Sequence, residues 1–292
     1  MAETDTGVAQ GGLGKIVGDA VLAFNHTNVM LPLVTSKQAV KGAITVQFPD
    51  YTKVESGSVD AVADGVDQGT VTSVTTDARS LTISEHVIRA DVSDLARMGN
   101  AEDLTGNVGA ILGNAVAAKL DKDLCYLGEA FAQQDTSTST TLALSHIFGA
   151  MRYLRAAGAP FPYNLVLSPK QVWGSKGLLA LTNDAAVTGT NVAKPMSLLG
   201  SKGEEAITNG WVGSMAGFNV YWSDQISEAA NAGRGFAFSK GAIGCGIGPE
   251  GLIRIETERN ASFRTTEYVA VGFWGECEIK DTFGVYMPSD VS

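Results

Sequence analysis

One glycine-rich stretch of the sequence has the spacing of a phosphate-binding loop. Gly246, Gly248 and Gly251 occupy the glycine positions of a GxGxxG motif. In a dinucleotide site these glycines lead into a helix whose N-terminus meets the pyrophosphate. Here Pro249 lies inside the motif, and residues 252–258 alternate apolar and polar side chains as a strand does. We interpret the stretch as a turn between strands, and keep a soluble α/β nucleotide-binding enzyme as an alternative from another functional class.

The cysteines and histidines lack the spacing of a disulfide framework or a metal site. The cysteines are odd in number and widely separated, and no two Cys or His residues lie within four positions of each other. We expect the cysteines to be reduced core residues and each histidine to be a packed or surface residue. These residues are Cys125, Cys245, Cys277, His26, His86 and His146.

Other catalytic patterns are missing from the sequence. Neither a GxSxG nucleophile elbow nor an HExxH zinc motif occurs. The carboxylate pairs Asp121/Asp123 and Glu256/Glu258 are interpreted as solvated or ion-paired faces of a helix and a strand. The sequence therefore predicts no catalytic residue, no cofactor and no metal, and we expect that the protein is not an enzyme.

The composition indicates a surface with unusually little charge. The 292 residues include 21 Lys and Arg against 31 Asp and Glu, a net charge of −10, and charged residues make up 18%, where about 25% is typical. An apolar fraction of 45% is too high for a disordered chain. The acidic balance argues against broad binding to a phosphate backbone, and no apolar run is long enough for a membrane span. We infer that much of the surface is covered by another surface.

Residues 39–90 predict a long two-stranded excursion. Residues 43–48 alternate like a strand, Pro49 interrupts them, and a polar, acidic stretch follows over 56–69. Two further β-branched segments, 70–75 and 81–84, complete the hairpin. Because a hairpin of this kind has too little core to be stable alone, it requires a neighbour in the same chain or in another subunit.

Residues 100–134 predict one long helix. Asn100 can cap its N-terminus, and apolar residues recur at helical spacing from Leu104 to Phe131. About nine turns correspond to ~50 Å at 1.5 Å per residue, enough to span a subunit.

A mixed α/β region and closing strands follow the long helix. We expect a helix capped by Ser145 with Ile147, Phe148, Met151 and Leu154 on its buried face. A strand at 164–167, a helix from Pro169 to about Leu181, and strands at 211–212, 218–222 and 235–238 come next. The absence of regular βαβ repetition argues against a Rossmann or barrel enzyme.

The order of these segments resembles the major capsid proteins of tailed double-stranded DNA bacteriophages, which have the Hong-Kong-ninety-seven-like capsid fold. The resemblance is carried by Met215–Ser223, by Phe236–Ile243, by Gly272–Cys277 and by Ala157–Ser168 followed by Pro169. It implies an α+β fold with an N-terminal arm (1–38), an extended β-hairpin loop (39–90), a peripheral domain with a spine helix (91–140), an α/β axial domain (141–250) and closing strands that return to the peripheral domain (251–292).

The resemblance also implies a function. It predicts a subunit that assembles with many copies of itself, as hexamers and pentamers, into an icosahedral head that encloses double-stranded DNA without sequence-specific binding. The expected partners are a separate scaffolding protein and a portal, with no membrane, and the expected location is the virion, assembled in the host cytoplasm. We select hairpin residues as candidates for the assembly interface: Asp50, Tyr51, Lys53, Asp60, Asp64 and Asp67.

Three alternatives remain open beside the capsid protein. An encapsulin-type compartment has the same fold but encloses enzymes, and a surface-array or tail-tube protein would form sheets or tubes. The nucleotide-binding enzyme named above is the third. Lys53 is the only lysine between Lys41 and Lys119, but no partner for it can be matched, so covalent cross-linking is not predicted.

Overall fold

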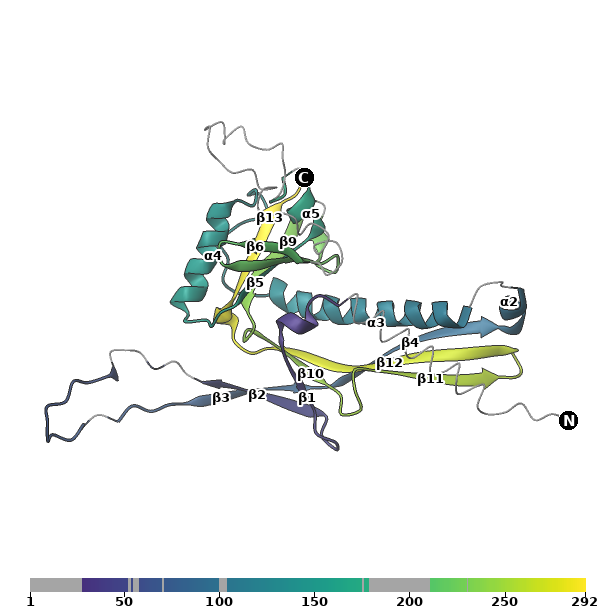
Figure 1. Cartoon of the computed structure of the whole chain (residues 1–292), viewed down its shortest axis with the longest axis horizontal. Helices are drawn as coiled ribbons and strands as arrows, with labels where there is room; N and C mark the ends of the chain where they lie inside the picture. Colours follow the sequence, from purple (N-terminus) through teal and green to yellow (C-terminus); the bar gives the residue numbers. More distant parts are fainter. Residues whose placement is uncertain are drawn as a thin grey trace.

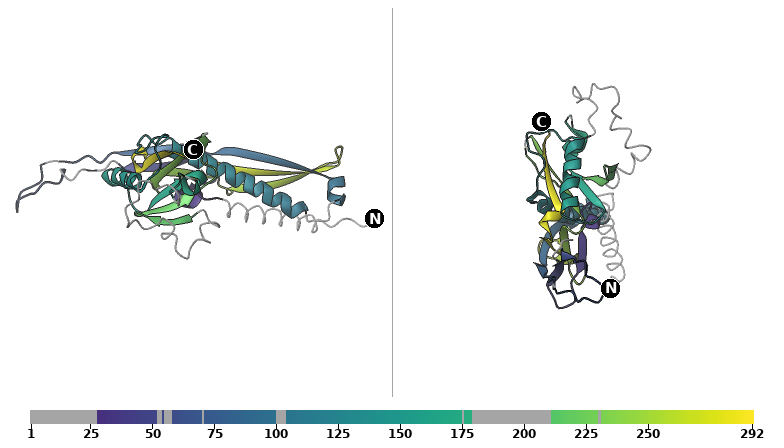
Figure 2. Two further views of the ribbon diagram at one scale, coloured as in Figure 1. Left: turned by 90° about the horizontal axis from the view of Figure 1, so that it is seen from above. Right: turned by 90° about the vertical axis from the view of Figure 1, so that its left-hand side faces the viewer.

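The computed structural model describes residues 28–51, 54, 58–69, 71–99, 104–174, 176–178, 211–229 and 231–292. The chain forms three parts, which we call the α/β lobe, the spine layer and the hairpin (Figure 1). The spine layer and the hairpin extend in opposite directions from below the lobe, as the view from above also shows (Figure 2). Among the described residues no helix is both long and apolar enough to cross a membrane.

In the described part of the chain, the spine layer is a five-stranded sheet covered by one helix. Its central strand β12 pairs with β4 on one side and with β11 and β10 on the other, and β1 is added parallel to β10. The strands are β1 (Thr35–Gln38), β4 (Ser84–Ser93), β10 (Ile243–Ile247), β11 (Ile253–Asn260) and β12 (Thr265–Glu278). A short helix, α2 (Asp94–Gly99), lies at the far end of this layer (Figure 1).

Helix α3 (Leu104–Glu129) is the predicted long helix, but it is shorter than expected. Its 26 residues span about 39 Å at 1.5 Å per residue. The predicted end at residue 134 is wrong because the chain finds other hydrogen-bond partners: the Ala132 N–H donates to Asp281 Oδ1 at 2.9 Å, and Gln134 forms a β-bridge with Tyr286. The predicted cap, Asn100, lies outside the described residues.

The α/β lobe is built on a six-stranded sheet in the order β13-β9-β5-β7-β6, with β8 paired to β9. Its strands are β5 (Tyr163–Leu167), β6 (Trp211–Met215), β7 (Phe218–Trp222), β8 (Glu228–Ala229), β9 (Ala232–Ser239) and β13 (Gly284–Asp290). All five residues of the central strand β5 are buried. The predicted strands are confirmed, including the turn at Ala216 and Gly217, where both residues have positive φ.

The two described helices of the lobe differ from the prediction in their caps, buried faces or ends. Helix α4 (Leu144–Ala156) buries Ile147, Ala150 and Leu154, whereas Phe148 is exposed because it lies one residue round the helix from Ile147. The predicted cap at Ser145 is wrong, because the helix begins after Ala143, whose N–H donates to His146 Nδ1.

Helix α5 (Pro169–Trp173) starts as predicted, with Ser168 Oγ accepting from the Gln171 N–H. It ends at Trp173 rather than near Leu181, because turn hydrogen bonds from Gly174 and Gly177 follow it. Leu181 itself lies outside the described residues.

The hairpin consists of β2 (Thr45–Tyr51) and β3 (Thr76–Thr82), paired antiparallel from Thr45–Thr82 to Tyr51–Thr76. Pro49 does not break the first strand, since a two-stranded ribbon leaves edge positions where a missing N–H is tolerated. Residues 71–75 are not in a strand. Residues 84–90, which we grouped with the hairpin, pair instead with β12.

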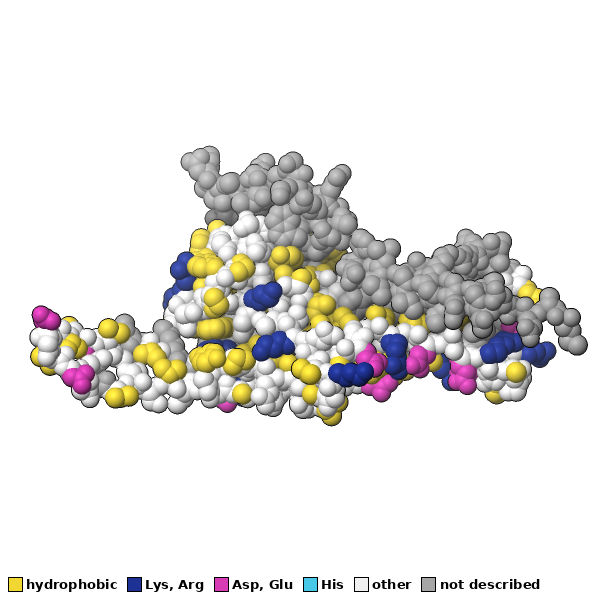
Figure 3. All heavy atoms as spheres, turned by 60° about the horizontal axis from the view of Figure 1, so that its bottom comes forward, with side chains coloured by type: hydrophobic (Ala, Val, Ile, Leu, Met, Phe, Trp, Pro, Cys, Tyr) yellow, Lys and Arg dark blue, Asp and Glu magenta, His cyan; other side chains and the backbone are white. Residues whose placement is uncertain are grey.

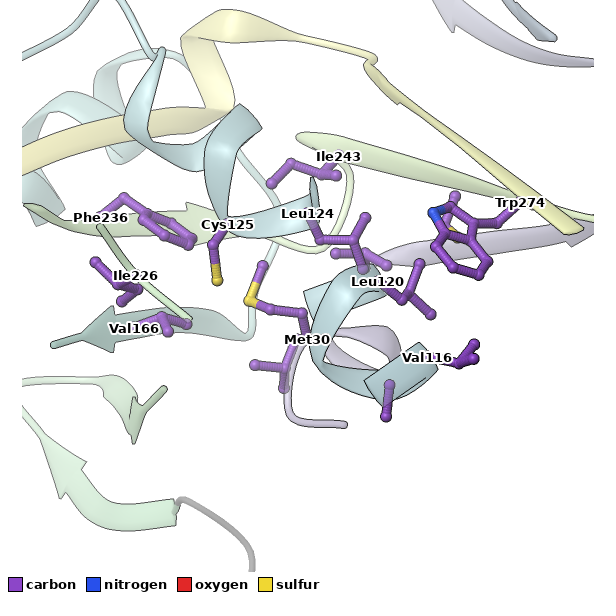
Figure 4. Packing of buried hydrophobic residues seen from close by; sticks show 14 of the residues in the cluster. Met30, Val116, Leu120, Leu124, Cys125, Val166, Ile226, Phe236, Ile243 and Trp274 are labelled. Atoms are coloured by element: carbon purple, nitrogen blue, oxygen red, sulfur yellow. The ribbon is translucent and has the colours of Figure 1, made fainter. Parts of the chain in front are cut away.

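A single buried cluster joins helix α3 to both sheets. Met30, Leu120 and Leu124 pack beside Phe236 of the lobe and Trp274 of the spine layer (Figure 4). The Trp274 ring stacks on His86 with centroids 4.0 Å apart and donates to Asp123 Oδ2 at 3.3 Å. The cysteines are free, as predicted, with Cys125 and Cys245 buried and Cys277 partly buried. This cluster fixes the direction in which the spine layer leaves the lobe.

Candidate assembly surface

The GxGxxG stretch connects two strands, as predicted. It begins with the last two residues of β10, Gly246 and Ile247, and continues into the turn before β11, which begins at Ile253, so no helix follows the glycines. Two of the glycines serve packing: a Cβ at Gly246 would lie 2.5 Å from Leu81 Cδ1, and one at Gly248 would lie 2.6 Å from Phe273 Cβ. The helix N-terminus that a dinucleotide site requires is therefore missing at this motif.

The root of the hairpin is fixed on the spine sheet by a small hydrophobic cluster. Val46 and Phe48 of β2 and Leu81 of β3 pack against Ala39 and Ile279. The close approach at Gly246 lets Leu81 lie directly on strand β10. The hairpin is therefore held by its base, while its far end projects away from the body (Figure 1).

The predicted site residues Asp50 and Tyr51 lie at the end of the paired strands. Lys280 Nζ donates to Asp50 Oδ1 at 2.9 Å and to the Tyr51 carbonyl at 3.2 Å. The same ammonium lies 5.0 Å from the centre of the Phe283 ring. Asp50 is thus partnered within its own chain, and Lys280, which sequence reasoning missed, positions the strand.

The predicted residues Asp60, Asp64 and Asp67 lie on the exposed loop of the hairpin. Lys53 lies outside the described residues. The sequence has no Lys or Arg between residues 53 and 79, so the loop is acidic throughout. The structure thus places five of the six candidates in two groups, with Asp50 and Tyr51 at the paired strands and the three loop aspartates beyond them.

Exposed valines between the loop aspartates are the second feature of the hairpin. Val71 is 92% exposed, and five further valines of the loop are exposed as well: Val54, Val59, Val62, Val66 and Val74. Sequence reasoning missed these side chains, although their interleaving with Gly and Asp was a visible signal. An apolar, acidic loop that no described residue of its own chain covers is suited to contact another surface.

The opposite end of the molecule exposes a second apolar group. Leu95 and Met98 of α2 are 82% and 80% exposed, and Phe263 in the turn between β11 and β12 is 75% exposed. Arg259, near the end of β11, holds α2 through two hydrogen bonds to Asp94, at 2.9 and 2.6 Å, and these bonds lower the pKa of that carboxyl. Sequence reasoning missed this group because its residues lie more than 160 positions apart.

The outer face of the spine sheet carries charged side chains, unlike the hairpin loop and the end at α2, where apolar side chains are exposed. Figure 3 shows Lys, Arg, Asp and Glu side chains gathered over this sheet and hydrophobic ones spread along the hairpin. Arg89 pairs with Asp91 and Glu267, and Arg254 pairs with Glu256. The prediction of an ion-paired face is therefore confirmed for Glu256. It is wrong for Asp121, which is 1% exposed because α3 turns it toward the core.

Comparison of the sequence with models of protein families gives no match, and a search among curated proteins gives none. Solved structures do match. The capsid of Ralstonia phage GP4 has a TM-score of 0.69 at 13% identity, over 89% of this chain and 87% of that chain. The capsid of cyanophage P-SCSP1u has a TM-score of 0.59 at 14% identity, over 88% and 86%. A virus-like particle from Pyrococcus furiosus has a TM-score of 0.59 at 9% identity, over 94% and 98%.

These likenesses extend over nearly the whole chain and over nearly the whole of each matched chain. They establish the fold: the chain has the α+β Hong-Kong-ninety-seven-like capsid fold, which confirms the predicted fold class.

Proposed function

We propose that this chain, which has the capsid fold of tailed bacteriophages, is a major capsid protein that assembles with copies of itself into a closed icosahedral head. The observation that carries the proposal is the hairpin. Its paired strands project from the body, and its loop exposes valines and aspartates that nothing in the described chain covers. A monomer gains nothing from such an extension, whereas a shell subunit can lay it on a neighbour.

The second end of the molecule supports the same proposal. Leu95, Met98 and Phe263 form an exposed apolar group far from the hairpin loop (Figure 1). Two different exposed surfaces at opposite ends of one subunit favour head-to-tail contacts, which close into rings when the rotation between subunits allows it. The low charged fraction of 18% agrees with a surface that is largely covered after assembly.

The further parts of the proposal follow from the shell role. The head would enclose double-stranded DNA without binding it tightly, because the net charge of −10 on each chain is unsuited to binding phosphates. We propose a structural, non-enzymatic role in the virion, with assembly in the host cytoplasm through hexamers and pentamers. A scaffolding protein and a portal are the proposed partners. The domain boundaries given above and the six hairpin residues remain predictions.

The proposal is tested by electron microscopy of the purified chain and of a variant that lacks residues 58–69. We expect closed icosahedral particles from the wild type. The deletion should leave a folded subunit with unchanged circular dichroism, because the loop contributes nothing to the buried clusters. It should nevertheless abolish closed shells.

A matched control separates the loop side chains from its length. Replacing Val59, Val62 and Val66 by Ser should impair assembly, whereas Val87→Ser, at an exposed site on the spine sheet, should leave it intact. Sheets or tubes from the wild type would contradict the head, and normal shells from the deletion would contradict the role of the loop.

One observation favours a second candidate. The likeness to the virus-like particle from Pyrococcus furiosus extends over 98% of the matched chain of that particle. An encapsulin-type compartment would give the same particles in the microscope, so their contents decide. Nuclease-protected DNA inside particles isolated from the natural source supports a phage head, and a protein cargo without DNA supports a compartment.

A further inference from the structure

A buried carboxylate on the spine helix has no counter-charge among the residues that the structure describes. Asp121 is 1% exposed, in the C-terminal half of α3, and within the described part of the chain no Lys, Arg or His forms an ion pair with it. A buried carboxylate without a cation is costly unless hydrogen bonds satisfy it. Its hydrogen-bond partners therefore indicate what it does.

Both carboxylate oxygens of Asp121 accept hydrogen bonds from the backbone of a distant segment. The Val29 N–H donates to Oδ2 at 2.9 Å, and the Met30 N–H donates to Oδ1 at 3.1 Å. The Met30 side chain is fully buried beside Leu120 and Leu124 (Figure 4). One side chain of α3 thus holds the backbone at Val29 and Met30.

The residues that follow Met30 continue from the backbone that Asp121 holds. Asn28 Oδ1 accepts from the Leu31 N–H at 2.7 Å, and a short 3-10 helix, η1 (Leu31–Leu33), follows. The chain then continues into β1, which pairs parallel with β10. Residues 28–34 contain no ionisable side chain, so nothing in this segment neutralises Asp121.

Two titratable groups of the described residues are coupled electrostatically to Asp121. Asp224, in the turn after β7, acts on it electrostatically, and the thiol of Cys125 lies one turn further along α3. Toward the lobe, Glu129 is occupied by Arg234 of β9, at 3.4 Å.

Charged groups on the neighbouring part of α3 are occupied with one another. Lys119 pairs with Asp123, and Asp123 also accepts from Trp274. The field of these two residues acts on His86 and Glu276 of the spine sheet. None of these groups compensates the buried carboxylate.

We propose that Asp121 is a proton-linked latch that holds residues 28–34 on the spine helix and loosens this segment as the pH rises. The inference goes beyond the shell function and does not rest on it.

The sign follows from the two states of the carboxyl. In the closed state, burial and Asp224 raise the pKa of Asp121 to about 7, although the two amide hydrogen bonds lower it. When the segment lifts away, water reaches the carboxyl and the pKa returns toward 3.8. The closed state therefore binds a proton more readily. The equilibrium constant for closing the segment is therefore largest below about pH 4. It falls by up to about tenfold per pH unit toward pH 7 and is constant at higher pH.

Hydrogen exchange of the full chain between about pH 5 and 9 tests the latch, with intrinsic exchange rates corrected for pH. The opening constant of a peptide that covers residues 28–34 should rise with pH and level off above about 7. Asp121→Asn, which has nearly the same shape, should give a curve that is flat with pH. A peptide from the buried strand β5 reports global unfolding in the same samples.

Two further variants keep the test sharp if Asp121→Asn folds poorly. Asp224→Asn removes a negative neighbour that raises the pKa of Asp121. The pH above which the opening constant stops rising should therefore be lower, while the hydrogen bonds of Asp121 remain. Asp123→Asn, on the same helix, should keep the wild-type curve. The latch is refuted if wild-type opening of residues 28–34 is independent of pH, if Asp121→Asn keeps the slope, or if these residues open only together with β5.

Discussion

Strands β3 and β4 are consecutive parts of one extended run, separated by Ile83, yet their surroundings differ completely. β3 pairs only with β2 in a two-stranded ribbon, and six of its seven residues are exposed. β4 pairs with β12 beneath helix α3, and its residues Ile88, Ala90 and Val92 pack against the main core. The difference shows that a strand buries its apolar side chains only where another layer of the chain packs against it.

The same contrast appears in the surface side chains of the two regions. The spine layer covers one face with α3 and fills the other with ion pairs such as Arg89–Glu267 and Arg254–Glu256. The hairpin has neither a covering helix nor such pairs among its described loop residues, and it exposes apolar side chains instead. We expect these exposed apolar side chains to be covered by another subunit.

Two phenylalanines provide the largest test of this contrast. Phe236→Ala removes a fully buried ring between α3 and the lobe sheet and should lower the free energy of unfolding by about 3–5 kcal/mol. Phe263→Ala, at an exposed turn, should change it by less than about 0.5 kcal/mol. Urea denaturation of unassembled subunits measures both. Equal losses would mean that the exposed end is covered within the monomer.

Two glycines give an intermediate effect. A Cβ at Gly272 would overlap the buried ring of Trp274, so Gly272→Ala should destabilise the subunit by about 1–3 kcal/mol. At Gly69, in the hairpin loop, an added Cβ would meet no atom within 4 Å, so Gly69→Ala should change stability by less than about 1 kcal/mol. The melting temperatures of the two variants compare them. A large loss at Gly69 would contradict an open loop.

The smallest effect is expected where the two regions meet. Lys280→Met removes the half-buried pair with Asp50 and should cost about 1 kcal/mol. Hydrogen exchange should quicken in β2 and stay unchanged in β12, since Lys280 holds only the hairpin strand. Asp50→Asn keeps a hydrogen-bond acceptor and should have less effect. If exchange in β2 does not respond to either variant, the hydrophobic cluster at Phe48 alone holds the hairpin root.

Local patterns in the sequence predicted most of the elements and few of their partners. The helical spacing along α3, the buried strand β5 and the cap at Ser168 were all visible, because each depends on neighbours within one or two turns. The end of α3 was predicted too late, because it depends on Asp281, far along the chain. The loop aspartates were selected from the sequence, but Lys280, the valines and the group at Phe263 were not.

The sequence alone determined that this protein has a long helix, a weakly supported hairpin, closing strands and too little charge for an isolated surface. These properties follow from periodicity and composition, which act locally or over the whole chain. The tertiary structure decided which carboxylates are solvated. Glu256 pairs with Arg254 on an open face, whereas Asp121 faces the core and holds the backbone of Val29 and Met30. Burial depends on which distant segment covers a residue, and no short pattern records that contact.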